Sequence, residues 1–221
     1  SQSDTYISKR FEFKYFLTPS EAAQIEAYLL KVIKLESDEN SKNGGYWVNS
    51  LYFDTPLMTD YREKDGSFLV RKKVRARMYE EHWSNSLAAV WLEVKRKRNM
   101  NIAKSRVRIS GDLWNEFIRD NTALTLLNTN EQFTEEEYTD LQSFAHTHIR
   151  GLYRPESIVR YKRKAYKAKF TSPVRITFDS DVRTCRFQDD HPESRLIPVS
   201  HQGVIMEVKF NDKLPWWFTD M

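Results

Sequence analysis

Basic side chains recur at every second position along several short segments of this chain. In residues 70–78 the two alternating sets are Val74, Ala76 and Met78 on one parity and Arg71, Lys73, Arg75 and Arg77 on the other. Successive side chains of a β-strand point to opposite faces, so such a segment has one apolar face and one cationic face. Arg and Lys side chains gathered in this way are suited to holding a polyanion, because guanidinium groups match phosphate oxygens well.

The same alternation returns elsewhere with glutamates placed among the bases. Residues 90–97 put Glu93 and Lys95 on one parity, and residues 204–210 do the same with Glu207 and Lys209. A face that simply meets water usually mixes both signs of charge with Ser, Thr and Gln, and this solvated face is the alternative interpretation. The excess of bases over carboxylates favours the anion-binding surface.

The totals restrict the class of protein. The chain has 221 residues with 35 Lys and Arg against 31 Asp and Glu, so it is not a uniformly basic protein. The length is sufficient for a substantial core, and we expect a single domain over residues 1–221 because no linker or internal repeat is evident. The only cysteine, Cys185, excludes an internal disulfide. No apolar run approaches the roughly 20 residues of a membrane span, so we expect a soluble, cytoplasmic protein.

The elements that position the charged residues can be predicted from periodicity and caps. Thr18, Pro19 and Glu21 form a capping box that predicts a helix over Pro19–Lys34, and two more helices are expected over Gly111–Leu127 and Thr134–Ile149. Alternating segments predict strands at 9–16, 46–53, 68–80, 88–97, 103–109, 156–169, 174–178, 183–187 and 204–210. The predicted class is α+β, a largely antiparallel sheet with helices packed on its outside.

Two arrangements of these strands are compatible with the charge pattern. In an open sheet, helices cover the apolar face and the charged face meets water. In a closed barrel or tunnel, the apolar parity faces outward onto helices and the charged parity lines a wet interior. Like charges brought together repel one another and lose hydration, and a bound polyanion would relieve this cost. Periodicity alone does not decide between the two arrangements.

Several fragments together resemble the triphosphate tunnel metalloenzymes, and among them the VTC-type polyphosphate polymerase domain. The fragments follow one another from about Arg10 to Phe218 and share one parity of charge. They are residues 10–15 (RFEFKY), 50–55 (SLYFDT), 73–79 (KVRARMY), 92–97 (LEVKRK), 161–166 (YKRKAY), 174–179 (VRITFD) and 206–210 (MEVKF). The resemblance implies an antiparallel eight-stranded tunnel with helices outside.

The resemblance also implies which residues bind the phosphates. The bases expected to act directly on the transferred group are Arg75, Arg77, Lys95, Arg163 and Arg175. The residues expected to hold the phosphate chain are Arg10, Lys14, Lys104, Arg106, Tyr161 and Lys209, with Arg106 favoured over Lys104. The expected metal ligands are Glu207, Glu12 and Glu93, of which the last two are either metal ligands, ion-pair partners of neighbouring bases, or both.

The chemistry implied is phosphoryl transfer with Mn²⁺ or Mg²⁺, which prefer oxygen ligands and often take only one or two carboxylates. ATP or another nucleoside triphosphate would donate its terminal phosphate to inorganic polyphosphate. Two alternatives stay open: hydrolysis of tripolyphosphate or nucleoside triphosphates on the same scaffold, and non-catalytic binding of polyphosphate or nucleic acid. Nucleic acid is disfavoured, because its binding surfaces usually combine bases with exposed aromatic residues or a basic helix.

Two smaller expectations complete the prediction. Relatives of the polymerase type carry a closing helix with a lysine after the last strand, and in this chain, which ends at Met221, that helix would be absent or truncated. Trp91 shares the parity of Glu93, so its ring is a candidate for stacking on a nucleobase.

Overall fold

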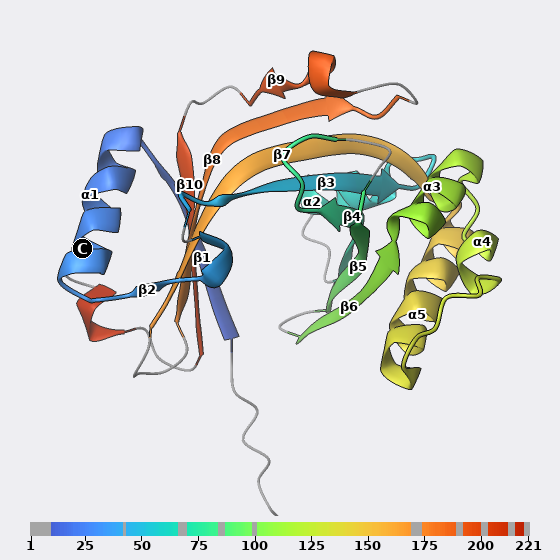
Figure 1. Cartoon of the computed structure of the whole chain (residues 1–221), viewed down its shortest axis with the longest axis horizontal. Coiled ribbons are helices and arrows are strands. Elements are labelled where there is room, and N and C mark those ends of the chain that lie inside the picture. The colour runs from blue at the N-terminus through green and yellow to red at the C-terminus, as the bar shows by residue number, and fades with distance from the viewer. Residues whose placement is uncertain are drawn as a thin grey trace, which may run out of the picture. The chain divides into compact units, whose positions relative to one another are not determined.

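The computed structural model describes residues 10–41, 43–65, 70–83, 87–98, 101–168, 174–188, 192–199, 203–211 and 215–218. The helices are α1 (Pro19–Lys31), α2 (Thr59–Asp65), α3 (Gly111–Asp120), α4 (Leu124–Leu127) and α5 (Glu135–Gly151), with short 3-10 turns at Glu39–Ser41, Pro192–Arg195 and Trp216–Phe218. The strands are β1 (Arg10–Leu17), β2 (Glu36–Ser37), β3 (Tyr46–Asp54), β4 (Val70–Met78), β5 (Ala89–Arg98), β6 (Asn101–Ser110), β7 (Arg154–Lys167), β8 (Arg175–Arg186), β9 (Ile197–Pro198) and β10 (Val204–Asn211). Figure 1 labels these elements along the chain.

The strands belong to a ten-stranded sheet whose main path runs β1-β10-β8-β7-β3-β4-β5-β6. The short strands β2 and β9 lie off this path, which leaves eight strands on it, the number implied by the resemblance. Every pairing whose register is described is antiparallel. The α+β class and the antiparallel sheet are therefore confirmed. In the described residues this path ends at β1 and at β6, so closure of the sheet stays a prediction.

The chain divides into two compact units, each assembled from separate stretches of sequence. The terminal unit draws on Ser1–Trp47, Tyr161–Arg183 and Pro198–Met221, and the central unit on Val48–Arg160 and Thr184–Ile197. Strands β3, β7, β8 and β9 contribute residues to both. A single domain over residues 1–221 stays a prediction.

The core of the central unit lies between its sheet and the helices α3, α4 and α5 (Figure 1). Strand residues of the apolar parity, such as Val74 and Leu92, meet Phe117 of α3 and Phe144 of α5 in this core. Ser110 ends β6 and also caps α3 by accepting a hydrogen bond from the backbone N–H of Leu113. This junction brings the helix back over the strand that precedes it.

In the terminal unit, α1 covers the apolar face of β1 and β10. The predicted capping box is present: the Thr18 hydroxyl accepts from the N–H of Glu21, and the Glu21 carboxylate accepts from the N–H of Thr18. Leu29 of α1 is fully buried in this core, and so is Ile176 of β8. Trp217, in the 3-10 turn near the C-terminus, packs against the same core.

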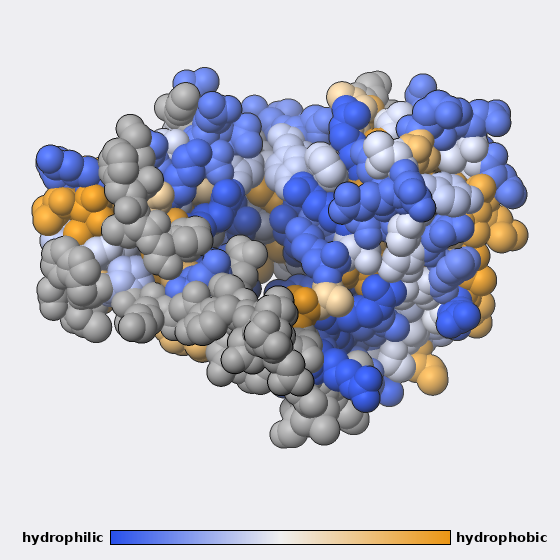
Figure 2. All heavy atoms as spheres, turned by 90° about the horizontal axis from the view of Figure 1, so that it is seen from below, coloured by the Kyte–Doolittle hydropathy of each residue, from blue (hydrophilic) through white to orange (hydrophobic). Residues whose placement is uncertain are grey.

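The surface is strongly polar, as 30% charged residues require. Figure 2 shows that hydrophilic side chains make up much of the described surface on the face drawn there. In the part of the chain that the structure describes, no helix is long and apolar enough to cross a membrane.

Candidate functional site: charged faces of the two units

In the central unit, the basic parity of β4, β5 and β6 forms the face of the sheet opposite the core. The strand registers place Arg75 opposite Glu93, and Glu93 opposite Arg106. We call this surface the basic face. Its predicted site residues are Arg75, Arg77, Glu93, Lys95, Lys104 and Arg106.

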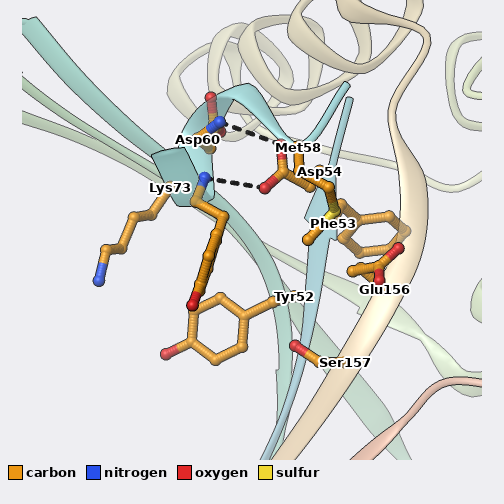
Figure 3. Close-up of a pocket in the computed structure, with 9 residues that line it drawn as sticks. Tyr52, Phe53, Asp54, Met58, Asp60, Lys73, Glu156 and Ser157 are labelled. Carbon is orange, nitrogen blue, oxygen red and sulfur yellow. Dashed lines mark hydrogen bonds between the residues drawn. The ribbon is translucent and has the colours of Figure 1, made fainter. Parts of the chain in front are cut away.

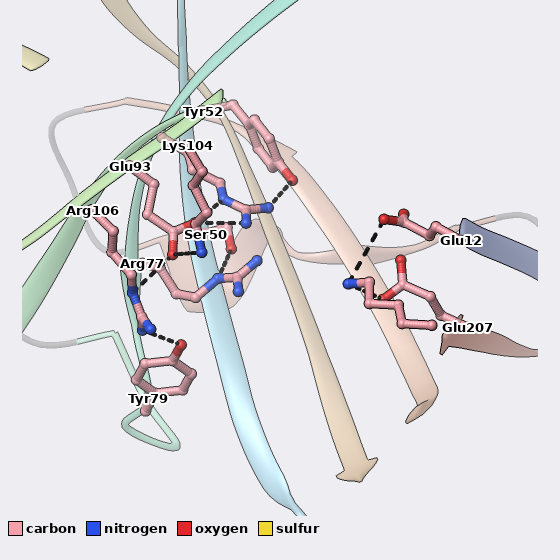
Figure 4. Close-up of polar contacts among 11 residues, drawn as sticks. Glu12, Ser50, Tyr52, Arg77, Tyr79, Glu93, Lys104, Arg106 and Glu207 are labelled. Atoms are coloured by element: carbon pink, nitrogen blue, oxygen red, sulfur yellow. Dashed lines mark hydrogen bonds and ion pairs between the residues drawn. The ribbon is translucent and has the colours of Figure 1, made fainter. Parts of the chain in front are cut away.

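Glu93 forms ion pairs with three bases of the basic face. Its side chain is 1% exposed, and its carboxylate lies 2.6 Å from Nη2 of Arg75, 3.1 Å from Nε of Arg106 and 3.3 Å from Nζ of Lys104 (Figure 4). Burial by itself would raise the pKa of Glu93, but the surrounding cations, Arg75 foremost, lower it to about 2. Both carboxylate oxygens face cations, so Glu93 is an ion-pair partner of these bases, and its role as a metal ligand stays a prediction.

Three lysines face one another directly across the strands of the basic face. Lys73 of β4 is the register partner of Lys95 of β5, and Lys95 is the register partner of Lys104 of β6. Like charges directly opposite one another on neighbouring strands are destabilising. Burial and the nearby guanidinium groups lower the pKa of Lys104, in spite of Glu93. Lys104 also pairs with Glu93 at 3.3 Å, and a bound anion would relieve the repulsion between the lysines of this row.

Hydroxyl groups that the sequence analysis did not single out hold the arginines of the basic face in place. Nη1 of Arg75 lies 3.3 Å from the Tyr52 hydroxyl, and Nε of Arg77 lies 3.4 Å from the Ser50 hydroxyl (Figure 4). Burial alone would raise the pKa of Tyr52, but Arg75 and other neighbouring cations lower it. Tyr52 and Ser50 have the parity of the basic face, which was the available signal in the sequence.

Arg106 is fixed from two sides as well. It donates to the Tyr79 hydroxyl at 3.0 Å, and its guanidinium carbon lies 3.9 Å from the centre of the Trp91 ring. The guanidinium group of Arg106 therefore packs on the face of the Trp91 ring, which was the predicted candidate for stacking on a nucleobase.

The terminal unit carries a second charged cluster, formed by Glu12 and Lys14 of β1 with Glu207 and Lys209 of β10. Nζ of Lys14 lies 3.3 Å from Glu207 and 3.5 Å from Glu12, and Nζ of Lys209 lies 2.7 Å from Glu207. Figure 4 shows the side chains of Glu12 and Glu207. Burial would raise the pKa of Glu207, but its contacts with Glu12 and the two lysines hold the pKa well below the ordinary range. Glu12 and Glu207 in turn raise the pKa of Lys14 against the effect of burial.

This carboxylate–lysine cluster is where a divalent ion would fit. Two glutamates from neighbouring strands supply oxygen ligands, and such ions commonly take one or two carboxylates and complete their sphere with phosphate and water. Among the described residues there is no group of three or more His, Cys, Asp or Glu side chains that could hold a metal. The donor set thus suits a metal that shares its ligands with a phosphate substrate.

The remaining predicted residues of the terminal unit lie on β7, β8 and the start of β1. Arg163 makes a bidentate pair with Asp179, with Nε–Oδ1 and Nη2–Oδ2 distances of 2.6 and 2.7 Å, and its guanidinium carbon lies 5.1 Å from the Tyr161 ring. Arg175 forms an ion pair with Asp38 at 2.8 Å. The backbone of Arg10 begins β1 opposite Asn211, and its side chain lies outside the described residues.

One expectation from the sequence needs correction here. The two short strands expected at 174–178 and 183–187 are one strand, β8, which continues from Arg175 to Arg186. Asp179 therefore lies inside a strand, and its carboxylate is turned to Arg163. Asp181, at φ 48°, marks the irregular point that divided the pattern.

Comparison with known proteins identifies the family. The family model for the VTC domain matches residues 9–221. The chain belongs to the VTC domain family. This membership agrees with the resemblance drawn from the strand fragments. The comparison with curated protein sequences found no significant match.

Solved structures that align over nearly the whole of this chain share little sequence with it. A Hippeastrum protein, named as a candidate adenylyl cyclase and described as having a dominant triphosphatase activity, is 13% identical with a TM-score of 0.50, covering 97% of this chain and 83% of its own. A candidate adenylate cyclase from Bacillus halodurans is 9% identical with a TM-score of 0.47. The alignment covers 96% of this chain and 86% of the Bacillus chain. The first likeness shows a shared fold over nearly the whole chain.

Proposed function

We propose that this VTC-domain chain transfers the terminal phosphate of a nucleoside triphosphate, most simply ATP, to the end of an inorganic polyphosphate chain. The observation that carries the proposal is the row of Lys73, Lys95 and Lys104, set directly opposite one another beside the arginines around Glu93. Like charges placed directly opposite one another on neighbouring strands are destabilising, and a bound polyanion would relieve this repulsion.

Phosphoryl transfer needs positioning and charge neutralisation more than covalent chemistry. A terminal oxygen of the polyphosphate chain attacks the γ-phosphorus, the bond from that phosphorus to the β–γ bridging oxygen breaks, and the nucleoside diphosphate leaves with the bond electrons. Arg75, Arg77 and Lys95 would hold and neutralise the phosphate oxygens, with Arg163 and Arg175 contributing further guanidinium groups. Lys14, Lys104, Arg106, Tyr161 and Lys209 would hold the chain.

Glu12 and Glu207 would hold Mn²⁺ or Mg²⁺, which when bound neutralises charge on the phosphate oxygens. Glu93 would keep the arginines of the basic face in place. The second candidate function is hydrolysis, in which water takes the place of the polyphosphate end. The shared fold with the Hippeastrum protein described as a triphosphatase favours keeping it as the alternative.

Incubation with ATP and Mn²⁺, followed by a gel that resolves polyphosphate ladders, tests the proposal. We expect a ladder, and a rate reduced at least about a hundredfold in the double variant Arg75→Ala with Arg163→Ala, because charge-stabilising groups typically contribute that much. Arg119→Ala, which removes an exposed arginine from α3, is the matched control. Free phosphate without a ladder would establish the hydrolase, and no reaction of the folded wild type would refute both functions.

A further inference from the structure

A hollow of 180 Å³ lies in the central unit beside the basic face (Figure 3). Four elements form it, with β3 contributing Tyr52, α2 contributing Asp60 and Tyr61, β4 contributing Lys73 and β7 contributing Glu156. Lys73 and Tyr52 belong also to the basic face, and the other residues that line the hollow have no part in the phosphate-binding arrangement above.

The hollow is continuous with the basic face. Lys73 lies between Arg75 and Arg71 on the same parity of β4, and it is the base of this row that lines the hollow. Tyr52 lines the hollow with its ring and places its hydroxyl 3.3 Å from Arg75. A ligand whose phosphates lie along Arg77, Arg75 and Lys73 can therefore extend directly into it.

The hollow is lined in part by acidic side chains, in contrast to the basic face beside it. Three acidic residues, Asp54, Asp60 and Glu156, are among those that line the hollow, whereas bases dominate the neighbouring face. The Asp60 carboxyl accepts a hydrogen bond from the Tyr153 hydroxyl at 2.8 Å, and burial raises its pKa to about 6. Carboxylates repel further phosphate and accept hydrogen bonds from amino and hydroxyl groups. The occupant favoured here is a neutral group rich in donors, joined to a polyanion.

The hollow also offers aromatic rings. Tyr61 is 60% exposed, and an exposed tyrosine beside a row of bases is suited to stacking on a nucleobase. By contrast, Trp91 on the basic face already packs against Arg106. A volume of 180 Å³ is below the roughly 300–1,000 Å³ of pockets that enclose drug-sized ligands, so it suits a base and its sugar with the phosphates outside.

We propose that this hollow binds the nucleoside end of the nucleoside triphosphate, with Tyr61 stacking on the base and the carboxyl groups of Asp60 and Glu156 accepting from its amino or hydroxyl groups. The inference rests on the proposed function, because it presumes that the triphosphate lies along the basic face. The nucleoside site would make the part of the basic face next to the hollow prefer nucleotides over inorganic polyphosphate.

The test compares the affinities of ATP and inorganic tripolyphosphate by calorimetric titration. Stacking of one base contributes roughly 1–3 kcal/mol, so Tyr61→Ala should weaken ATP binding about tenfold and leave tripolyphosphate binding unchanged. Tyr61→Phe keeps the ring and should bind ATP like the wild type. Tyr138→Ala, which removes an exposed tyrosine from α5, is the control and should change neither affinity.

The outcomes separate the inference from the proposed function. Wild-type protein that binds both ligands, with a Tyr61→Ala variant that binds ATP unchanged, would overturn the nucleoside site and leave the proposed function intact. Equal weakening of both ligands by Tyr61→Ala would also overturn it, since the ring would then act on phosphate binding. Wild-type protein that binds neither ligand would overturn both the site and the function.

Discussion

Among single residues, Glu93 has the greatest effect on how positive charge is arranged in the central unit. It is almost completely buried and engages Arg75, Lys104 and Arg106 at once. A buried carboxylate of this kind keeps guanidinium groups in fixed positions, but it neutralises only part of their charge. The bases that remain in excess are the ones available to phosphate.

Replacement of Glu93 by Gln tests this role through stability. The pKa of Glu93 is about 2 in the folded protein, against a reference value of 4.5. The ionised form is therefore favoured by folding, and its contribution is complete above pH 4.5 and is lost as the pH falls toward 2. The shift corresponds to about 3 kcal/mol, so Glu93→Gln should lower the free energy of unfolding by about that amount at pH 7.

Urea unfolding between pH 7 and pH 3 would measure the effect, with Glu116→Gln, an exposed carboxyl group on α3, as the control. The difference between wild type and Glu93→Gln should shrink as the pH falls below 4.5. A difference that stays constant over this range would show that Glu93 acts through packing alone.

Residue parity could be predicted from the sequence, but residue partners could not. Alternation alone placed Arg75, Glu93 and Arg106 on one face, because the side-chain period of a strand is local. The pairing of Arg163 with Asp179 depends on the register between β7 and β8, which no local pattern specifies. For the same reason, Tyr52 and Ser50 had the correct parity without an evident role.

At the scale of the elements, helix α5 shows what local signals can and cannot specify. Its start was predicted at Thr134, which is the N-cap residue and forms a capping box with Glu137. The single helix expected over 111–127 is instead α3 and α4, because Asn121 adopts a left-handed conformation (φ 45°) and donates to the carbonyl of Tyr153. That partner is distant in sequence, so the break could not be predicted from the helical pattern.

Helix α5 also carries a buried histidine, which makes a prediction of its own. His148 is 3% exposed and packs against Phe117 and Phe144 in the core of the central unit. Burial lowers its pKa to about 4, from 6.5. As the pH falls, His148 therefore binds a proton in the unfolded chain before it does so in the folded protein. The free energy of unfolding should decrease by up to about 3 kcal/mol between pH 6.5 and pH 4.

His148→Leu removes the titrating group while keeping an apolar side chain in the core. Its free energy of unfolding should decrease less than that of the wild type between pH 7 and pH 4, as measured by urea unfolding. His146→Leu, an exposed position on the same helix, is the control and should behave like the wild type. Parallel pH profiles for wild type and His148→Leu would contradict the assignment of His148 as a neutral buried group.

At the scale of the whole molecule, VTC family membership and the sheet order agree with the resemblance drawn from the strand fragments. Eight strands lie on the main path, and each unit turns its apolar parity toward helices and its charged parity away from them. The strands of the main path could be located because each carries its own alternation, although β8 was divided into two segments and the short strands β2 and β9 were not predicted. Closure of the sheet depends on contacts between distant strands, and it stays a prediction.

The most direct test of the account is a calorimetric titration of inorganic polyphosphate into the wild type, Arg77→Ala and Arg119→Ala. Arg77 lies on the basic face beside Ser50, whereas Arg119 is an exposed residue of α3. A charge-assisted hydrogen bond contributes roughly 1.5–3 kcal/mol, so Arg77→Ala should bind at least about tenfold more weakly and Arg119→Ala should match the wild type. Equal affinities for all three proteins would contradict the claim that the basic face holds the phosphate chain.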